Sequence, residues 1–229
     1  AVDKAEENHG LADRINGDGP ANLAKAAKKA GAKLVHISTD YVFGGNLDIS
    51  KDYKEDDPKA PVTAYGKTKL HGEEEIAKNM DEYYIFRTAW LYGIGGNNFV
   101  KTMTKLGSTR DEINVVADQH GSPTYAKDLT EIIYQAINKN IPFGVYNATN
   151  EGYTTWYEFT KEILAMQGIE CKVNPVTTEE YIEMMKVTQA KRPFNSQMSK
   201  AKLEACEIKV PDWKDGLKRY LEEAKNLEQ

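Results

Sequence analysis

Residues 33–44 read KLVHISTDYVFG, and residues 64–79 read AYGKTKLHGEEEIAKN. The first stretch opens with a short apolar run rich in β-branched residues, which predicts a strand over residues 33–38. The second stretch predicts a helix over its whole length. Between them lies a loop of about residues 41–63, and a loop this long in a compact domain is usually functional or flexible. The order of strand, loop and helix predicts one unit of an α/β sheet.

The same alternation continues along the rest of the chain. Further helices are predicted over residues 20–31, 98–106, 126–138, 155–167 and 212–225. Further strands are predicted over residues 83–89, 112–116 and 144–148. Beyond residue 167 the pattern is irregular until the last helix. Short apolar strands separated by helices predict an α/β fold with a doubly wound, mostly parallel, Rossmann-like sheet.

The chain is expected to form a larger and a smaller part. Residues 1–150 are predicted to be the C-terminal part of a Rossmann-type α/β domain, and residues 151–229 a smaller substrate-binding region. The less regular residues 94–125 are expected either in the α/β domain or in the smaller region, which would form a cap over the sheet. Open parallel sheets bind ligands at the carboxyl edge of their strands, so we expect the cap to lie over that edge.

Composition and charge exclude several classes of protein. The chain has 229 residues, of which 40% are hydrophobic and 28% charged, so it can bury a core. Its net charge of −5 argues against nucleic acid or anionic lipid as a partner, and no run approaches the roughly 20 apolar residues that span a bilayer. The distant Cys171 and Cys206 fit a reducing, cytoplasmic location. The histidines are scattered and the acidic run over residues 73–75 is interpreted as a solvated helix face, so no metal site is expected.

Tyr65 and Lys69 stand four residues apart at the start of a predicted helix, so their side chains share one face. A tyrosine hydroxyl titrates near about pH 10, and a neighbouring ammonium and the helix N-terminus both lower that pKa. Such a phenol suits proton transfer at a carbonyl or an alcohol. Tyr157 and Lys161 form a second pair, which we interpret as packing plus surface charge. The same interpretation stays open for the first pair taken alone.

Ser38, Thr39 and Asp40 come at the end of a predicted strand, where a parallel sheet presents catalytic groups. The Thr39 hydroxyl could hydrogen-bond a substrate carbonyl and share a proton with Tyr65, and Asp40 could accept from a substrate hydroxyl. All three residue types also favour turns and helix caps, so a purely local role is the alternative.

Two further residues are candidates for substrate contacts. Trp90 follows the strand over residues 83–89, and its flat apolar face suits a sugar or nicotinamide ring; the alternative is a core tryptophan. Arg192 lies in the stretch AKRPFNS, and its guanidinium could pair with a phosphate or diphosphate. A surface arginine is the alternative there.

Six stretches together carry a family resemblance. They are AVDKAE at residues 1–6, STDYVF at 38–43, YGKTKLHGE at 65–73, RTAWLYG at 87–93, VADQHGSPT at 116–124 and RPFNS at 192–196. In this combination the sequence resembles the extended short-chain dehydrogenase/reductases and, within them, the dTDP-4-dehydrorhamnose reductases. The resemblance spans essentially the whole chain, and the opening stretch corresponds to the loop after the family's fourth strand.

The resemblance implies an activity and residue roles. The activity is NAD(P)H-dependent reduction of the 4-keto group of dTDP-4-dehydro-L-rhamnose to dTDP-L-rhamnose, a step of polysaccharide biosynthesis. Tyr65 would protonate the carbonyl oxygen, Lys69 would bind the nicotinamide ribose and lower the tyrosine pKa, and Thr39 would bind the carbonyl oxygen. The implied cofactor-binding residues are Tyr65, Lys69 and Ser38. The implied substrate-binding residues are Thr39, Asp40, Trp90 and Arg192.

The implied cofactor is NADPH or NADH, the implied partner is a nucleotide sugar, and a homodimer is a possible assembly. One alternative is another nucleotide-sugar reductase or epimerase of the same family. A second is a non-catalytic relative that binds a nucleotide sugar or regulates a partner. The intact Thr39, Tyr65 and Lys69 count against that second alternative, because a binding module has no need of an activated phenol.

The glycine-rich dinucleotide fingerprint of this family, which follows its first strand, has no counterpart in the sequence. The nearest match, GDGPAN at residues 17–22, has Asn22 where the third glycine is needed and follows no predicted strand. We therefore expect the chain to be a portion of a longer polypeptide that contains the first strands of the sheet. The alternative is a truncated paralogue.

Overall fold

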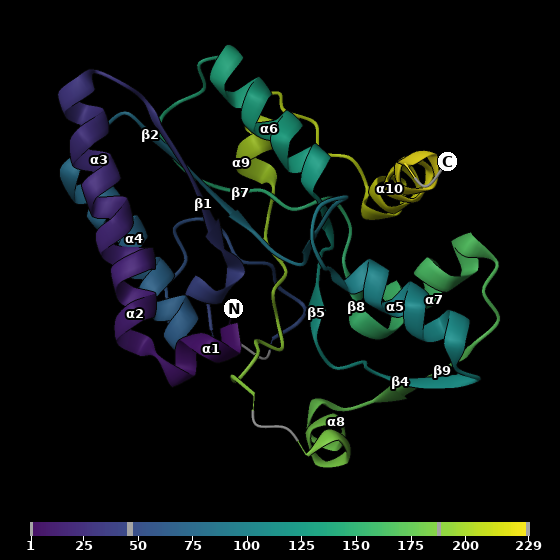
Figure 1. Cartoon of the computed structure of the whole chain (residues 1–229). Helices are drawn as coiled ribbons and strands as arrows, with labels where there is room; N and C mark the ends of the chain where they lie inside the picture. Colours follow the sequence, from purple (N-terminus) through teal and green to yellow (C-terminus); the bar gives the residue numbers. More distant parts are fainter. Residues whose placement is uncertain (1, 45–47, 187–188, 228–229) are drawn as a thin grey trace.

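Three parallel strands form the main sheet, in the order β1, β2, β7 (Figure 1). They are β1 (Leu34–Thr39), β2 (Tyr83–Thr88) and β7 (Gly144–Asn147). The computed structural model describes residues 2–44, 48–186 and 189–227. In the register of the sheet Thr39 pairs with Thr88, so the carboxyl ends of β1 and β2 are level. The strands predicted over 33–38, 83–89 and 144–148 are confirmed to within one residue at each end.

Helices cover both faces of this sheet, as Figure 1 shows. On one face lie α3 (Gly19–Ala30) and α4 (Ala64–Asn79), which pack around the buried Ile85 of β2. On the other face lie α6 (Ala126–Asn138) and α9 (Ala201–Ala205), which enclose the buried Phe86. Successive side chains of a strand point to opposite faces, so β2 contributes side chains to the packing on each face of the sheet. The doubly wound α/β architecture predicted from the sequence is confirmed.

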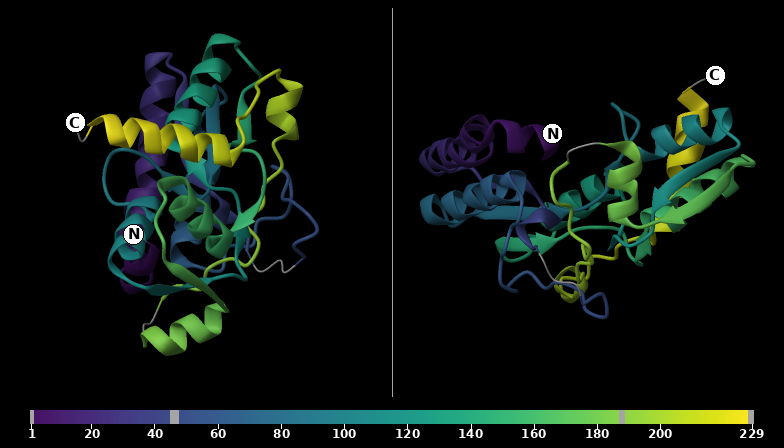
Figure 2. Two further views of the ribbon diagram at one scale, coloured as in Figure 1. Left: turned by 90° about the vertical axis from the view of Figure 1, so that its right-hand side faces the viewer. Right: turned by 90° about the horizontal axis from the view of Figure 1, so that it is seen from below.

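A second core lies on the opposite side of the molecule from α3 and α4 (Figure 2). Its helices and strands are α5 (Phe99–Thr109), α7 (Trp156–Gln167), α10 (Trp213–Leu227), β4 (Glu112–Val116) and β9 (Lys172–Val176). Strands β4 and β9 pair in parallel, and Ile113, Phe159 and Leu217 are among the buried side chains. The core therefore combines residues from before and after residue 150.

Short strand pairs connect the main sheet to this second core. The parallel pair is β3 (Leu91–Tyr92) with β6 (Thr124–Tyr125), and the antiparallel pair is β5 (His120–Gly121) with β8 (Thr154–Thr155). A last helix, α8 (Thr178–Met185), follows β9. Within the described ranges, no helix combines the length and the apolar character needed to cross a membrane.

Two predictions of local structure are wrong. The opening residues are helical rather than a loop: α1 (Val2–Glu7), α2 (His9–Asp13) and the π-helical turn η1 (Arg14–Asp18) lead directly into α3. Tertiary contacts explain this, because the Glu6 carboxylate accepts a hydrogen bond from the backbone N–H of Ala64 at the start of α4. The segment after residue 167 contains β9, which was missed because its sequence, KVNPV, is polar and includes a proline.

The acidic run over residues 73–75 is also not a uniformly solvated face. The side chain of Glu73 is buried and pairs with the equally buried Arg87 of β2, at 2.6 Å between Oε2 and Nη2. Glu74, the next residue, is exposed. A buried ion pair at this point joins α4 to the main sheet.

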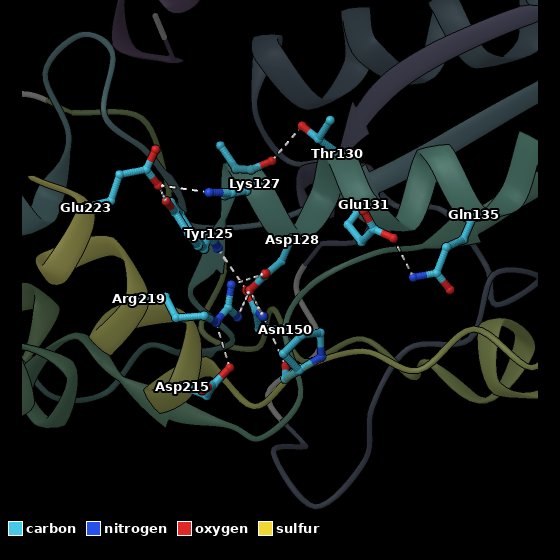
Figure 3. Close-up of polar contacts among 12 residues, drawn as sticks. Tyr125, Lys127, Asp128, Thr130, Glu131, Gln135, Asn150, Asp215, Arg219 and Glu223 are labelled. Carbon is cyan, nitrogen blue, oxygen red and sulfur yellow. Dashed lines mark hydrogen bonds and ion pairs between the residues drawn. The ribbon is translucent and has the colours of Figure 1, made fainter.

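A second ion-pair network holds α10 against α6 (Figure 3). The Arg219 guanidinium donates to both carboxylate oxygens of Asp128, at 2.7 and 2.8 Å, and its Nε donates to Asp215 at 2.8 Å. The buried Asn150 amide also donates to Asp128, at 2.7 Å. Asp128 thus accepts from three donors and links the C-terminal helix to the loop after β7.

We expect Asp128→Ala to lower the free energy of unfolding by about 2–4 kcal/mol, because it leaves one N–H of the buried Asn150 amide and part of the Arg219 guanidinium without an acceptor, while the Pro211 carbonyl still accepts from Asn150 at 3.0 Å. Denaturant unfolding measures the change. Asp215→Ala is the control: this carboxylate is mostly exposed, so its loss should cost at most about 0.5 kcal/mol. If the two substitutions lowered stability equally, Asp128 would not be the carboxylate that stabilises this network.

Candidate functional site

A pocket of about 310 Å³ lies beside the core that contains Ile113 and Phe159, which supplies Met103 and Val115 to its lining. One wall is apolar and is formed by Trp90, Phe99, Met103, Val115 and Trp156. The polar lining is formed by Tyr41, Asn114, Gln119, Tyr181, Gln189, Arg192 and Ser196. Apolar walls with a few fixed polar groups are typical of pockets for small molecules. Trp90 and Arg192, both predicted from the sequence, lie in this lining.

The aromatic wall rests on a stacked pair of tryptophans. The rings of Trp90 and Trp156 are nearly parallel, with centroids 3.7 Å apart. Trp156 donates its indole N–H to Gln119 Oε1 at 3.2 Å, which fixes the ring in place. The backbone of Trp90 is left-handed, with φ of 49°, and a Cβ on Gly121 would lie 2.9 Å from its ring, so residue 121 must be glycine. Sequence reasoning missed Trp156, although it directly follows the N-cap Thr155 of a predicted helix.

Thr39 and Asp40 lie together at the end of β1. Thr39 caps the short 3₁₀ helix η2 (Asp40–Val42) by accepting from the backbone N–H of Tyr41, so the local role considered above is realised. Its hydroxyl donates to Asp40 Oδ1 at 3.0 Å, and the Ser196 hydroxyl donates to Asp40 Oδ2 at 2.5 Å. Burial raises the pKa of Asp40 to about 6. Asp40 is not part of the pocket lining, and Ser196 stands between it and the pocket.

Tyr65 lies in the first turn of α4 because Thr63 caps this helix, accepting from the N–H of Gly66 at 2.9 Å. A Cβ on Gly66 would meet the Tyr41 carbonyl at 2.3 Å, so glycine allows α4 to cross η2 closely. The half-buried Tyr65 ring meets the Tyr41 ring edge-on, with centroids 5.5 Å apart. Burial and then the charge of Asp40 raise the pKa of Tyr65, and a side-chain hydrogen bond with Thr39 lowers it.

Lys69 does not act on Tyr65 as the sequence predicted. Its ammonium donates to the Ile37 carbonyl at 2.6 Å and lies 3.2 Å from His36 Nε2. Burial, and then the charge of Lys69, lower the pKa of His36 to about 4, so the imidazole is neutral at pH 7 and can accept this hydrogen bond. The predicted fall in the pKa of Tyr65 is therefore absent. The i, i+4 spacing placed Lys69 on the correct face but did not show that β1 would take its ammonium.

Arg192 is held at the pocket by two partners from distant parts of the chain. It donates to the Tyr41 hydroxyl at 3.1 Å and to Asp3 Oδ2 of α1 at 3.0 Å. The backbone N–H of Ala190 also donates to Asp3, at 2.9 Å. Tyr41 thus connects the guanidinium to the edge of the Tyr65 ring. The only sequence signal that Tyr41 would connect these two residues was its position within the stretch STDYVF.

The predicted residues thus form two groups. Thr39, Asp40 and Tyr65 adjoin the pocket through Tyr41 and Ser196. The Lys69 ammonium reaches from α4 to the backbone of β1, and Ser38 of the same strand has a buried hydroxyl with no hydrogen-bond partner among the described residues. Within the same ranges, no three His, Cys, Asp or Glu side chains gather so as to hold a metal ion.

Comparison with known proteins identifies the family. The family described as RmlD substrate binding domain matches residues 1–226. The solved structure of a dTDP-4-dehydrorhamnose reductase from Clostridium acetobutylicum is 45% identical, with a TM-score of 0.91 over 98% of this chain and 78% of that one. The chain belongs to the dTDP-4-dehydrorhamnose reductase family. This confirms the resemblance and the oxidoreductase class, and NAD(P)H is the cofactor of that family.

Two more relatives align with the chain over a similar length. A dTDP-4-dehydrorhamnose reductase from Bacillus anthracis, solved in complex with NADP, is 43% identical with a TM-score of 0.90 over 97% of this chain and 76% of that one. The spore coat polysaccharide biosynthesis protein SpsK of Bacillus subtilis is 43% identical over 223 residues, which are 97% of this chain and 76% of the relative.

Proposed function

We propose that this chain contributes the proton donor and the sugar-nucleotide pocket to an enzyme that reduces dTDP-4-dehydro-L-rhamnose to dTDP-L-rhamnose. The observation that carries the proposal is a protonated, half-buried phenol, Tyr65, adjoining an aromatic pocket through Tyr41. Relatives that are named for this reaction and align over most of the chain support the choice of substrate.

Ser38 of β1 and the Lys69 ammonium beside this strand fit the ribose end of a nicotinamide cofactor. Ser38 keeps a buried hydroxyl without a partner among the described residues, and such an orphaned group is typical of a ligand contact. Lys69 has three N–H donors, of which Ile37 and His36 take two within the same ranges, so one remains for a ribose hydroxyl. When bound, NADPH or NADH supplies the hydride that reaches the carbonyl carbon.

In this proposal Tyr65 donates its hydroxyl proton to the substrate carbonyl oxygen. A proton donor must hold its proton at the working pH, so the raised pKa of Tyr65 suits reduction. The tryptophan wall would pack against the apolar face of the sugar or base. Arg192 would exchange Asp3 for the diphosphate, with which a guanidinium pairs well.

The test is a reductase assay on the complete natural chain. We expect NADPH to be oxidised on addition of dTDP-4-dehydro-L-rhamnose, with dTDP-L-rhamnose as the product by mass spectrometry and NMR. Omission of the sugar nucleotide is the blank. Turnover of a different nucleotide-linked 4-keto sugar, with none of this one, would replace the substrate assignment. Binding of the sugar nucleotide without NADPH or NADH oxidation would favour the non-catalytic relative.

Trp156→Ala should raise KM by about tenfold with little change in kcat, because the loss of an aromatic contact worth about 1.5 kcal/mol weakens substrate binding before chemistry. Steady-state kinetics measures both constants. Tyr157→Ala is the matched control, since this neighbouring aromatic residue does not line the pocket. A fall in kcat with unchanged KM would contradict a binding role.

A further inference from the structure

A chain of hydrogen bonds runs from the aromatic wall of the pocket to α8. Trp156 donates its indole N–H to Gln119 Oε1 at 3.2 Å, and Gln119 Nε2 donates to Thr178 Oγ1 at 3.0 Å. The Thr178 hydroxyl donates to Asp118 Oδ1 at 2.6 Å, and the Thr178 backbone N–H donates to Asp118 Oδ2 at 2.9 Å. The chain therefore connects α7, which begins at Trp156, to α8 through the loop after β4.

The groups at the two ends fix the direction of every bond in this chain. An indole N–H can only donate, so the atom of the buried Gln119 amide that faces it is the oxygen, and the amide nitrogen faces Thr178. An ionised carboxylate can only accept, so the Thr178 hydroxyl hydrogen points to Asp118. The Thr178 oxygen is then left to accept from Gln119. The Gln119 side chain thus has a single orientation that satisfies all its neighbours.

Helix α8 depends on these contacts for its position. It lies against β4 (Figure 1), and none of its side chains is buried, so apolar packing holds it only weakly. Within the described ranges, Asp118 and Gln119 provide its hydrogen bonds to other elements, apart from one long contact of 3.7 Å to Met184 Sδ. Tyr181 of α8 lines the pocket, so the position of this helix sets one side of it.

We propose that Gln119 and Asp118 are positioning residues that set the affinity of the pocket for the sugar nucleotide. Gln119 fixes the plane of the Trp156 ring in the aromatic wall. Asp118 fixes the start of α8, which brings Tyr181 to the pocket. The inference rests on the proposed function, in which this pocket binds a sugar nucleotide. It gives a role to two residues of the stretch VADQHGSPT, to which the family resemblance assigned none.

Substitutions along the chain, made in the complete natural protein, test the proposal. Gln119→Met removes both hydrogen bonds of the amide and should raise KM by about threefold to tenfold with little change in kcat, because it loosens the binding wall and leaves the proton donor in place. Thr178→Val should raise KM by about twofold to fivefold. Since Thr178 lies outside the pocket lining, its effect must pass through Gln119 or α8. Thr178→Ser keeps the hydroxyl and should restore the wild-type KM.

Gln167→Met is the matched control. Gln167 also belongs to α7 and also donates to a threonine, Thr104 Oγ1 at 2.9 Å, but neither residue lines the pocket. Its substitution should leave KM unchanged. The double variant Gln119→Met with Thr178→Val measures the coupling between the two residues. If they act through one chain, the double variant should raise KM by less than the product of the two single effects.

A second set of measurements does not depend on turnover. Near-UV circular dichroism reports how rigidly aromatic rings are held. Gln119→Met should weaken the signal of the stacked tryptophans, and Gln167→Met should not. Calorimetric titration with dTDP-L-rhamnose measures the affinity of the pocket directly, and denaturant unfolding shows whether each variant folds. If Gln119→Met does not fold, Thr178→Val and its rescue by Thr178→Ser decide.

The outcomes separate the inference from the proposed function. Wild-type affinity in both Gln119→Met and Thr178→Val would overturn the inference, and so would an equal loss of affinity in Gln167→Met. A loss confined to Gln119→Met would also overturn it, because Gln119 would then act by touching the ligand and not through α8. Failure of the wild-type protein to bind dTDP-L-rhamnose would instead reject the proposed function, while the circular dichroism would still report the hold of Gln119 on the tryptophan wall.

Discussion

Tyr65→Phe should lower kcat by about 10²- to 10⁴-fold and leave the dissociation constant of the sugar nucleotide nearly unchanged. The substitution removes only the hydroxyl that donates the proton. The phenylalanine ring keeps the edge-on contact with Tyr41 and the position in the first turn of α4. Steady-state kinetics measures the rate, and isothermal titration calorimetry with the sugar nucleotide measures binding.

The chain offers a matched control for this substitution. Tyr157 and Lys161 repeat the spacing of Tyr65 and Lys69, but Tyr157 lies outside the pocket and its ring contacts the Lys161 ammonium at 5.0 Å. Tyr157→Phe should leave kcat unchanged. Near-normal turnover by Tyr65→Phe, or an equal loss in both variants, would show that Tyr65 is not the proton donor.

The fold was predictable where local pattern and tertiary environment agree. The strand of β1 and the helix α4 have the apolar content and the caps that their structures require, and the structure confirms them almost to the residue. The opening helices and β9 were not predictable, because contacts between distant segments stabilise them. Glu6 reaches the start of α4, and the polar β9 is a strand because β4 pairs with it.

In the candidate site, too, local pattern predicted some features, and contacts between distant segments determine the others. Helical spacing correctly placed Tyr65 and Lys69 on one face of α4, and Thr39 lies at the end of β1 as predicted, while its role toward a substrate stays a prediction. Spacing cannot show which partner a long side chain will reach, and the Lys69 ammonium reaches back to β1. Spacing also cannot show that Ser196, more than 150 residues away, would donate a hydrogen bond to the Asp40 carboxylate. Contacts of that separation depend on the folded chain.

Glu73→Ala should lower the free energy of unfolding by about 3–5 kcal/mol, because it leaves a buried guanidinium without its counter-charge. Arg87 is 2% exposed and donates to Glu73 from Nε, at 3.0 Å, and from Nη2, at 2.6 Å. Its remaining contacts, the Glu55 carbonyl at 2.9 Å and the Phe43 ring at 5.0 Å, carry no full negative charge. Denaturant unfolding measures the loss, and the exposed Glu74→Ala should change stability by less than about 0.5 kcal/mol.

A double substitution separates the ion pair's effect on stability from its effect on position. Glu73→Leu with Arg87→Met replaces both charges by apolar side chains of similar size, so much of the lost stability should return. Glu73 follows Lys69 by one helical turn, and Arg87 lies opposite Ser38 in the sheet, so the pair fixes α4 against the strand ends. If that positioning matters, the double variant will be stable yet slower than wild type. If it regains both stability and rate, apolar packing alone places Tyr65, and the buried charges are not needed for the geometry of the site.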